Sequence, residues 1–177
     1  MKRIVLVFGL ISGALMALFM FATMPFIDKI GLDRGYVVGY TGMVLAFILI
    51  FFGIRSYREN VGGGTITFGR AFVVGILIAV ISSICYVIAW QVLFYGFMPD
   101  FFDKYAAHEI TKARASGATP EKIQATIQEM EQVKQLGRKP FLHAAFTFLE
   151  PFPVGLIITV ISAAILRKTR KVAMSNE

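Results

Sequence analysis

Residues 71–97, AFVVGILIAVISSICYVIAWQVLFYGF, form a long apolar stretch without a single charged side chain. A helix needs about 20 apolar residues to cross the hydrocarbon core of a bilayer, and this stretch is long enough. Trp90 follows Arg70 by about 20 residues, which at 1.5 Å per residue carries the helix to the opposite membrane interface. The stretch therefore predicts a transmembrane helix, with Trp90 in an interfacial aromatic belt.

Three further apolar stretches of membrane-spanning length surround this one, at residues 4–24, 35–54 and 141–166. The composition agrees, because 56% of the chain is hydrophobic and only 16% is charged, whereas soluble domains carry roughly 25% charged residues. The first stretch exceeds the apolar part of a signal peptide, about 7–15 residues, so we expect it to be retained. The sequence predicts an all-α integral membrane protein, with one membrane domain over residues 1–177 and four transmembrane helices.

The only long polar segment, residues 99–140, separates the third span from the fourth and predicts a helical insertion. Residues 101–115 have a helical composition, and Gly117 is a plausible break. Thr119-Pro120-Glu121 then provides a capping hydroxyl, a proline and an acid, in the order that starts a helix. Apolar residues recur on that second helix at spacings of three and four: Ile123, Ile127, Met130 and Val133. This stripe has to pack on the neighbouring helix, the bilayer surface or a partner.

The distribution of basic residues predicts the orientation, since short cytoplasmic loops are enriched in Lys and Arg. The short link between the first two spans has only Lys29 and Arg34. The opposite side has many more: Lys2, Arg3, Arg55, Arg58, Arg70, Arg167, Lys168, Arg170 and Lys171. We therefore expect an inner (plasma) membrane protein with both termini in the cytoplasm and residues 99–140 in the periplasm or outside the cell. That segment has seven basic and six acidic residues, a near balance that argues against nucleic acid as a partner.

Glu150 is the first candidate for a functional residue, because an ionisable group within a membrane span is a functional hypothesis. His143, Thr147 and Glu150 share one helical face by their spacing, which could form a proton relay or a cation site. Pro151 suggests a second interpretation, in which the Glu150 carboxylate caps N–H groups where the helix restarts. We favour the structural interpretation, because a relay normally needs partners within the membrane.

No motif for catalysis, a cofactor or a metal accompanies this candidate site. His108 and His143 are far apart in the sequence, and Cys85 is the only cysteine. The glycine-rich loop within residues 55–70 lacks the spacing and strand context of a phosphate-binding loop, so a turn between helices is the better interpretation. We expect no cofactor, no bound metal and no enzymatic activity.

Small residues at four-residue spacing predict close helix packing in lipid. They form three rows: Gly9 and Gly13; Gly35 and Gly39; Gly155, Thr159 and Ala163. We favour packing within one chain and leave a homodimer open. Residues 72–83, FVVGILIAVISS, also resemble residues 152–163, FPVGLIITVISA. We interpret this echo as chance rather than as an inverted repeat, since apolar helices draw on few residue types.

Several of these stretches together resemble a known family. They are the first span with its Gly9 and Gly13, FGIRSYR at residues 52–58, GGGTITFGRAFVVG at residues 62–75 and FPVGLII at residues 152–158. The chain resembles the DUF4199 family, bacterial membrane proteins of unknown function, over nearly its whole length. The resemblance implies four spans in a bacterial inner membrane, and it implies no substrate and no catalytic residue.

Two functions are compatible with these features. The first is a structural or accessory membrane protein whose outer helices contact a partner or the membrane surface. The second is a small transporter or permease subunit that uses the region of Glu150. The shortage of buried polar residues favours the first.

Overall fold

The computed structural model describes residues 1–168, and over these residues the chain is helical with one isolated β-bridge and no strand. Four segments are long and apolar enough to cross a membrane, Lys2–Phe26, Leu32–Asn60, Phe68–Phe97 and Pro140–Leu166. The predicted all-α fold with four transmembrane helices is therefore confirmed. The elements are α1 (Lys2–Thr23), the 3₁₀ turn η1 (Met24–Phe26), α2 (Ile27–Ile30), α3 (Leu32–Asn60), α4 (Phe68–Phe97), α5 (Phe101–Ala115), α6 (Pro120–Gly137), α7 (Pro140–Leu149) and α8 (Pro151–Leu166).

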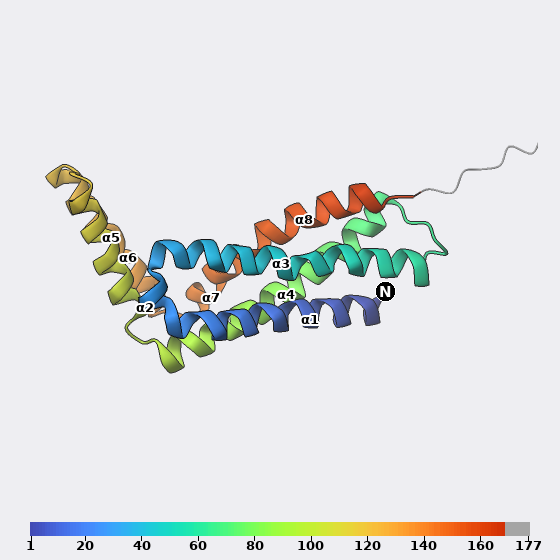
Figure 1. Ribbon diagram of the computed structural model, residues 1–177, viewed down its shortest axis with the longest axis horizontal. Helices are drawn as coiled ribbons and strands as arrows, with labels where there is room; N and C mark the ends of the chain where they lie inside the picture. Colours follow the sequence, from blue (N-terminus) through green and yellow to red (C-terminus); the bar gives the residue numbers. More distant parts are fainter. Residues whose placement is uncertain (169–177) are drawn as a thin grey trace, which may run out of the picture.

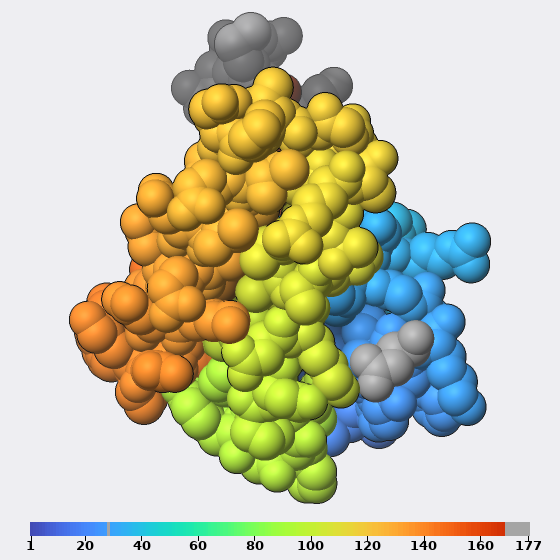
Figure 2. Space-filling model, turned by 90° about the vertical axis from the view of Figure 1, so that its left-hand side faces the viewer, coloured from blue at the N-terminus to red at the C-terminus, as the bar shows by residue number. Residues whose placement is uncertain are grey.

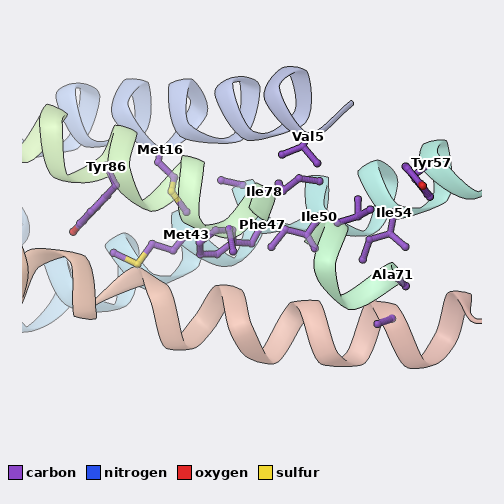
Figure 3. Packing of buried hydrophobic residues seen from close by; sticks show 14 of the residues in the cluster. Val5, Met16, Met43, Phe47, Ile50, Ile54, Tyr57, Ala71, Ile78 and Tyr86 are labelled. Carbon is purple, nitrogen blue, oxygen red and sulfur yellow. The ribbon is translucent and has the colours of Figure 1, made fainter. Parts of the chain in front are cut away.

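The spanning helices form a bundle in which α3 and α4 contact each other, while α1 and α8 each pack against both of them. Figure 1 shows α1 and α8 on opposite sides of α3. The side chains between the helices are apolar, and Phe47, Ile50, Ile54 and Ile78 are completely buried (Figure 3). The outward surface of each span is apolar as well, with Leu18, for example, 67% exposed. A lipid bilayer is the environment that suits the outward surface of these helices.

The small residues of the first span pack against α4, as predicted for packing within one chain. A Cβ atom added to Gly9 would lie 2.8 Å from Cγ2 of Ile81, and one added to Gly13 would collide with Cys85. The hydroxyl of Ser82 donates a hydrogen bond of 3.1 Å to the carbonyl oxygen of Gly9. The absence of a side chain at Gly9 and at Gly13 lets the two helices approach that closely.

The sequence echo has a structural counterpart in the contact between α4 and α8. Gly75 and Gly155 occupy equivalent positions in the two copies, as do Ala79 and Thr159. A Cβ atom on Gly75 would lie 2.7 Å from Cγ2 of Thr159, and one on Gly155 would lie 2.9 Å from Cβ of Ala79. The glycine of each copy therefore packs against the other copy, and the shared pattern forms one interface between α4 and α8.

The polar insertion folds as two helices, α5 and α6, that pack against each other. Gly117 turns the chain between them with a φ of +71°, and the Thr119 hydroxyl accepts a hydrogen bond from the backbone N–H of Lys122. The stripe on α6 is covered, since Met130 is buried and Ile123, Ile127 and Val133 are partly buried. Since α6 packs mainly against α5, this neighbouring helix accounts for the burial of the stripe within the hairpin.

Two contacts join α5 to α6 near the base of this helical hairpin. The Lys134 ammonium lies 2.7 Å from the Asp103 carboxylate, and this hydrogen bond lowers the pKa of Asp103 below its ordinary value. A Cβ atom on Gly137 would collide with the ring of Phe102. The glycine therefore permits the close approach of the two helices at this point.

The hairpin is also attached to the spanning helices. Tyr95 on α4 donates a hydrogen bond of 2.9 Å to the carbonyl oxygen of Gly137, and Gln91 donates one of 3.1 Å to that of Pro140. On its other side, the Lys112 ammonium lies 2.7 Å from the carboxylate of Asp33. Figure 2 shows α5 between α6 and the segment around α2. We call this end of the bundle the hairpin end.

The N-terminus, the turn between α3 and α4, and the end of α8 lie together at the opposite end (Figure 1). Gly63 and Gly64 turn the chain with φ values of +59° and +80°, and Ile66 forms a β-bridge with Lys168. The predicted basic side of the molecule thus corresponds to one end of the bundle. Arg170 and Lys171 lie outside the described residues.

Candidate functional site

The fourth span is broken at Glu150, and this break creates the site. Proline lacks an N–H group and its ring collides with the carbonyl group four residues earlier, so Pro151 interrupts the helical ladder. The N–H of Glu150 instead reaches the Thr147 carbonyl oxygen at 3.4 Å. Beyond the break α8 packs against α3 and α4, whereas α7 packs mainly against α4. The break thus leaves space between α3 and α7 at the hairpin end.

The Glu150 side chain makes no capping hydrogen bond to α8, so the predicted cap is wrong. Its Oε2 atom instead accepts a hydrogen bond of 2.9 Å from the hydroxyl of Tyr86 on α4. Tyr86 is 9% exposed, and Figure 3 shows its hydroxyl directed toward the ribbon of the fourth span. A phenol on a neighbouring helix therefore holds the carboxyl group in place.

His143 lies two turns before Glu150 and is 6% exposed. Its Nε2 atom accepts a hydrogen bond of 3.0 Å from the indole N–H of Trp90. An imidazole nitrogen that accepts a hydrogen bond carries no proton, so the ring is neutral with its proton on Nδ1. Among the described residues, Nδ1 has no hydrogen-bond partner. The Thr147 hydroxyl donates a hydrogen bond of 2.8 Å to the carbonyl oxygen of His143.

These residues surround one cavity of about 380 Å³ at the hairpin end. All three predicted residues, His143, Thr147 and Glu150, line it. The structure adds aromatic and sulfur-containing side chains from other helices: Met16, Met20, Met24, Tyr36, Tyr40, Met43, Tyr86 and Trp90. Most of the wall is apolar, with a few polar groups at one side, which is the usual character of a small-molecule site.

The hairpin closes the end of the cavity. Phe101 and Phe102 at the start of α5 belong to its wall. Phe101 meets Trp90 edge to face with ring centroids 5.1 Å apart, and Phe102 lies 5.5 Å from the His143 ring. The insertion is therefore part of the site and not a separate appendage.

The cavity reaches the surface of the bundle along α3. Tyr36 and Tyr40 line it and are still 45% and 43% exposed. Gly35 and Gly39, the second predicted glycine row, also lie in the wall. Nothing lies within 4 Å of a Cβ atom added to Gly39. This row therefore leaves room for the cavity at Gly39, whereas the first and third rows bring helices together.

A protein-family model described as a protein of unknown function, DUF4199, matches residues 7–168. The chain belongs to the DUF4199 family. The resemblance inferred from the sequence is thereby confirmed. No curated protein and no solved structure matches this chain.

In this DUF4199 chain, the sequence predicted the site residues of the fourth span but not their hydrogen-bond partners on α4. The shared helical face predicted that His143, Thr147 and Glu150 lie together. Tyr86 and Trp90 were missed as their partners, because a neutral phenol or indole in a span gives no charge signal. The positions of Tyr86 and Trp90, four residues apart on one helical face, were the available signal.

The chemistry available at this site is binding through a carboxyl group, phenols and aromatic rings. The part of the chain that the structure describes has no group of three or more His, Cys, Asp or Glu side chains placed to hold a metal ion. Glu150 is the acidic group in the described wall, and Tyr86 occupies one of its oxygen atoms. The Glu150 carboxyl group and the phenols of Tyr36 and Tyr40 are polar groups of this wall that can contact a ligand.

Proposed function

We propose that this chain is a multi-pass membrane protein that binds a small amphiphilic molecule in the cavity at the hairpin end, as expected of a small transporter or permease subunit. The observation that carries the proposal is the cavity of about 380 Å³ that brings Glu150, Tyr86 and His143 together. Its volume falls within the range of about 300–1,000 Å³ typical of small-molecule sites.

In the accessory role considered from the sequence, the outer helices contact a partner or the membrane surface, and the apolar stripe on α6 was one surface that such a contact could use. Because α6 packs on α5 and Met130 is buried, the hairpin itself shields part of that stripe. The hairpin has another role in the proposal, since Phe101 and Phe102 bound the cavity. We expect binding without catalysis, because the described wall offers no nucleophile paired with a base.

The orientation proposed for this chain places the cavity near the outer interface of a bacterial inner membrane. Support comes from the sequence, which has more basic residues beside the N-terminus, the turn between α3 and α4 and the end of α8 than in the link between α1 and α3. The first three segments lie together at the end of the bundle opposite the hairpin (Figure 1). Reporter fusions after residue 118 test this orientation. A reporter active only outside the cytoplasm should be active there, and activity of a cytoplasmic reporter would contradict the orientation.

Binding can be measured with the chain's own fluorescence, because Trp90 is the only tryptophan and it lines the cavity. The purified full-length chain in dodecylmaltoside is titrated with para-bromobenzyl alcohol, whose bromine quenches indole fluorescence on contact. We expect saturable quenching. A Gly39→Leu variant should weaken it, because the new side chain projects into open space in the cavity wall.

Gly69→Leu is the matched control, since Gly69 also lies on a spanning helix with nothing within 4 Å of an added Cβ atom, but it does not line the cavity. This control should bind the probe like the wild type. Quenching that rises linearly without saturation, or that is equal in the Gly39→Leu and Gly69→Leu variants, would contradict a binding site in the cavity.

A further inference from the structure

The described cavity wall contains one acidic side chain, that of Glu150, and no lysine or arginine side chain to balance its charge. His143 does not provide a positive charge either, because its Nε2 atom accepts the Trp90 hydrogen bond. Removing a carboxylate from water costs several kcal/mol unless a charge of opposite sign accompanies it. A ligand that brings a positive charge would supply the missing partner.

The neighbours of Glu150 are aromatic. Tyr86 touches its carboxyl group, and Tyr36, Tyr40 and Trp90 line the same cavity from α3 and α4. The faces of tyrosine and tryptophan rings attract cations through their quadrupole, and this attraction increases when the cation leaves water. Rings around one acid form the kind of wall that holds an alkylammonium group.

The rest of the wall suits the remainder of such a ligand. Methionine side chains from α1, η1 and α3 line the cavity on the side of α1, together with Phe19. Thioethers and rings contact hydrocarbon without needing hydrogen bonds, and methionine adapts to irregular shapes. One charged group beside Glu150 and an apolar body against these residues would fill both parts of the cavity.

We infer that the ligand of this cavity is a monovalent amphiphilic organic cation, with its ammonium group between the Glu150 carboxylate and the rings of Tyr36, Tyr40 and Tyr86. This inference rests on the proposed binding role and names the class of its ligand. The ammonium group can belong to a free aryl- or alkylammonium compound or to the choline headgroup of a lipid. Both sources share the chemistry that the cavity recognises.

Three brominated probes of similar shape test the charge preference by quenching of Trp90 in the full-length chain. They are para-bromobenzyltrimethylammonium, its neutral carbon analogue para-bromoneopentylbenzene and the anion para-bromophenylacetate. We expect the cation to bind about tenfold more tightly than the neutral analogue, a difference of about 1.4 kcal/mol, and the anion to bind most weakly. Equal binding of the cation and the neutral analogue would overturn the cation assignment while leaving the proposed binding role intact. Failure of all three to bind saturably would overturn both.

A Glu150→Gln variant identifies the group responsible for the preference. Glutamine keeps the shape and an acceptor oxygen for Tyr86 but removes the charge. We expect the ratio of the two affinities, cation over neutral analogue, to fall about tenfold. Unchanged preference for the cation in a variant that still binds the neutral analogue would refute the role of Glu150. If this variant does not fold, loss of preference in a Tyr36→Leu, Tyr40→Leu double variant gives the second test, and an unchanged preference there would refute the role of the rings.

Competition separates the two sources of the cation. Dihexanoylphosphatidylcholine, titrated against the bound brominated cation, should displace it if the cavity accepts a lipid headgroup, with dihexanoylphosphatidylglycerol as the control without an ammonium group. Displacement by the choline lipid alone would indicate that the ammonium group belongs to a lipid headgroup. If neither lipid displaces the brominated cation, the ammonium group belongs to a free organic cation. Displacement by both lipids equally would contradict recognition of an ammonium group.

Discussion

The hydrogen bond between Tyr86 and Glu150 should couple the third and fourth spans energetically. Its length is 2.9 Å and Tyr86 is 9% exposed, so water competes little for it. Hydrogen bonds between membrane helices average about 0.6 kcal/mol and reach about 1.7 kcal/mol in double-mutant cycles. Because this one joins a phenol to a carboxyl group, we expect a value near the upper limit, about 1.5 kcal/mol.

A double-mutant cycle with Tyr86→Phe and Glu150→Ala measures this coupling. The free energy of unfolding is determined by titrating dodecylmaltoside micelles with sodium dodecyl sulfate and following Trp90 fluorescence. The double variant should be less destabilised than the sum of the single variants, by about 1.5 kcal/mol. Tyr95→Phe is the matched control, because its hydroxyl bonds to the Gly137 carbonyl oxygen, and its effect should simply add to that of Glu150→Ala. A coupling energy near zero for the Tyr86 pair would refute the description of the site.

Three other predictions concern the helix contacts. Gly155→Leu should destabilise the chain by about 1–3 kcal/mol in the same titration, because a Cβ atom there lies 2.9 Å from Cβ of Ala79. The pKa of Asp103 lies below its ordinary value because Lys134 donates a hydrogen bond to it. The stability from this pair should therefore be present above the ordinary carboxyl pKa and lost as the pH falls through the lowered value, and Lys134→Ala should raise the Asp103 pKa in an NMR titration. Thr119→Ala should remove the cap of α6 at a cost of about 1 kcal/mol to that helix, seen as faster amide hydrogen exchange in its first turn.

Each of these predictions has a control. Gly69→Leu should leave the free energy of unfolding nearly unchanged, because nothing lies near its Cβ position, and an equal loss in both glycine variants would contradict close packing of α4 and α8. Lys122→Ala keeps the Asp103 pair and should leave the Asp103 pKa where it is. Thr126 lies on the same helix but is not its cap, so Thr126→Ala should leave amide exchange in the first turn of α6 unchanged. Exchange there as fast as in the Thr119→Ala variant would refute the capping role of Thr119.

Periodicity and length were sufficient to predict the architecture. The limits of α5 agree with the predicted segment of residues 101–115, and α6 begins at the predicted capping motif. The spans extend beyond the predicted ranges where polar residues continue a helix, as at Arg55–Asn60 of α3. Charge marks the membrane boundary, but it does not end a helix, so composition alone could not give these ends.

The site was only half predictable, because its geometry depends on a bend and on contacts distant in the sequence. Pro151 predicted a break, but the sequence could not show that the break would separate α7 from α3 and leave a cavity. The residues that complete the site, Tyr86 and Trp90, come from another span. Capping was the expected role of Glu150, because a single stretch of sequence shows only the hydrogen-bond partners that are close to Glu150 along the chain. Its partner in the structure, Tyr86, lies on another span.

A ligand bound in the cavity beside Glu150 should be directly visible in a structure of the complex. The most direct measurement is a crystal structure of the full-length chain with para-bromobenzyltrimethylammonium, in which anomalous scattering locates the bromine atom. We predict a bromine peak inside the cavity bounded by Tyr36, Tyr86 and Phe101, with density for the ammonium group at Glu150. Bromine peaks confined to the lipid-facing surface of the helices, with the cavity lacking the probe, would contradict it.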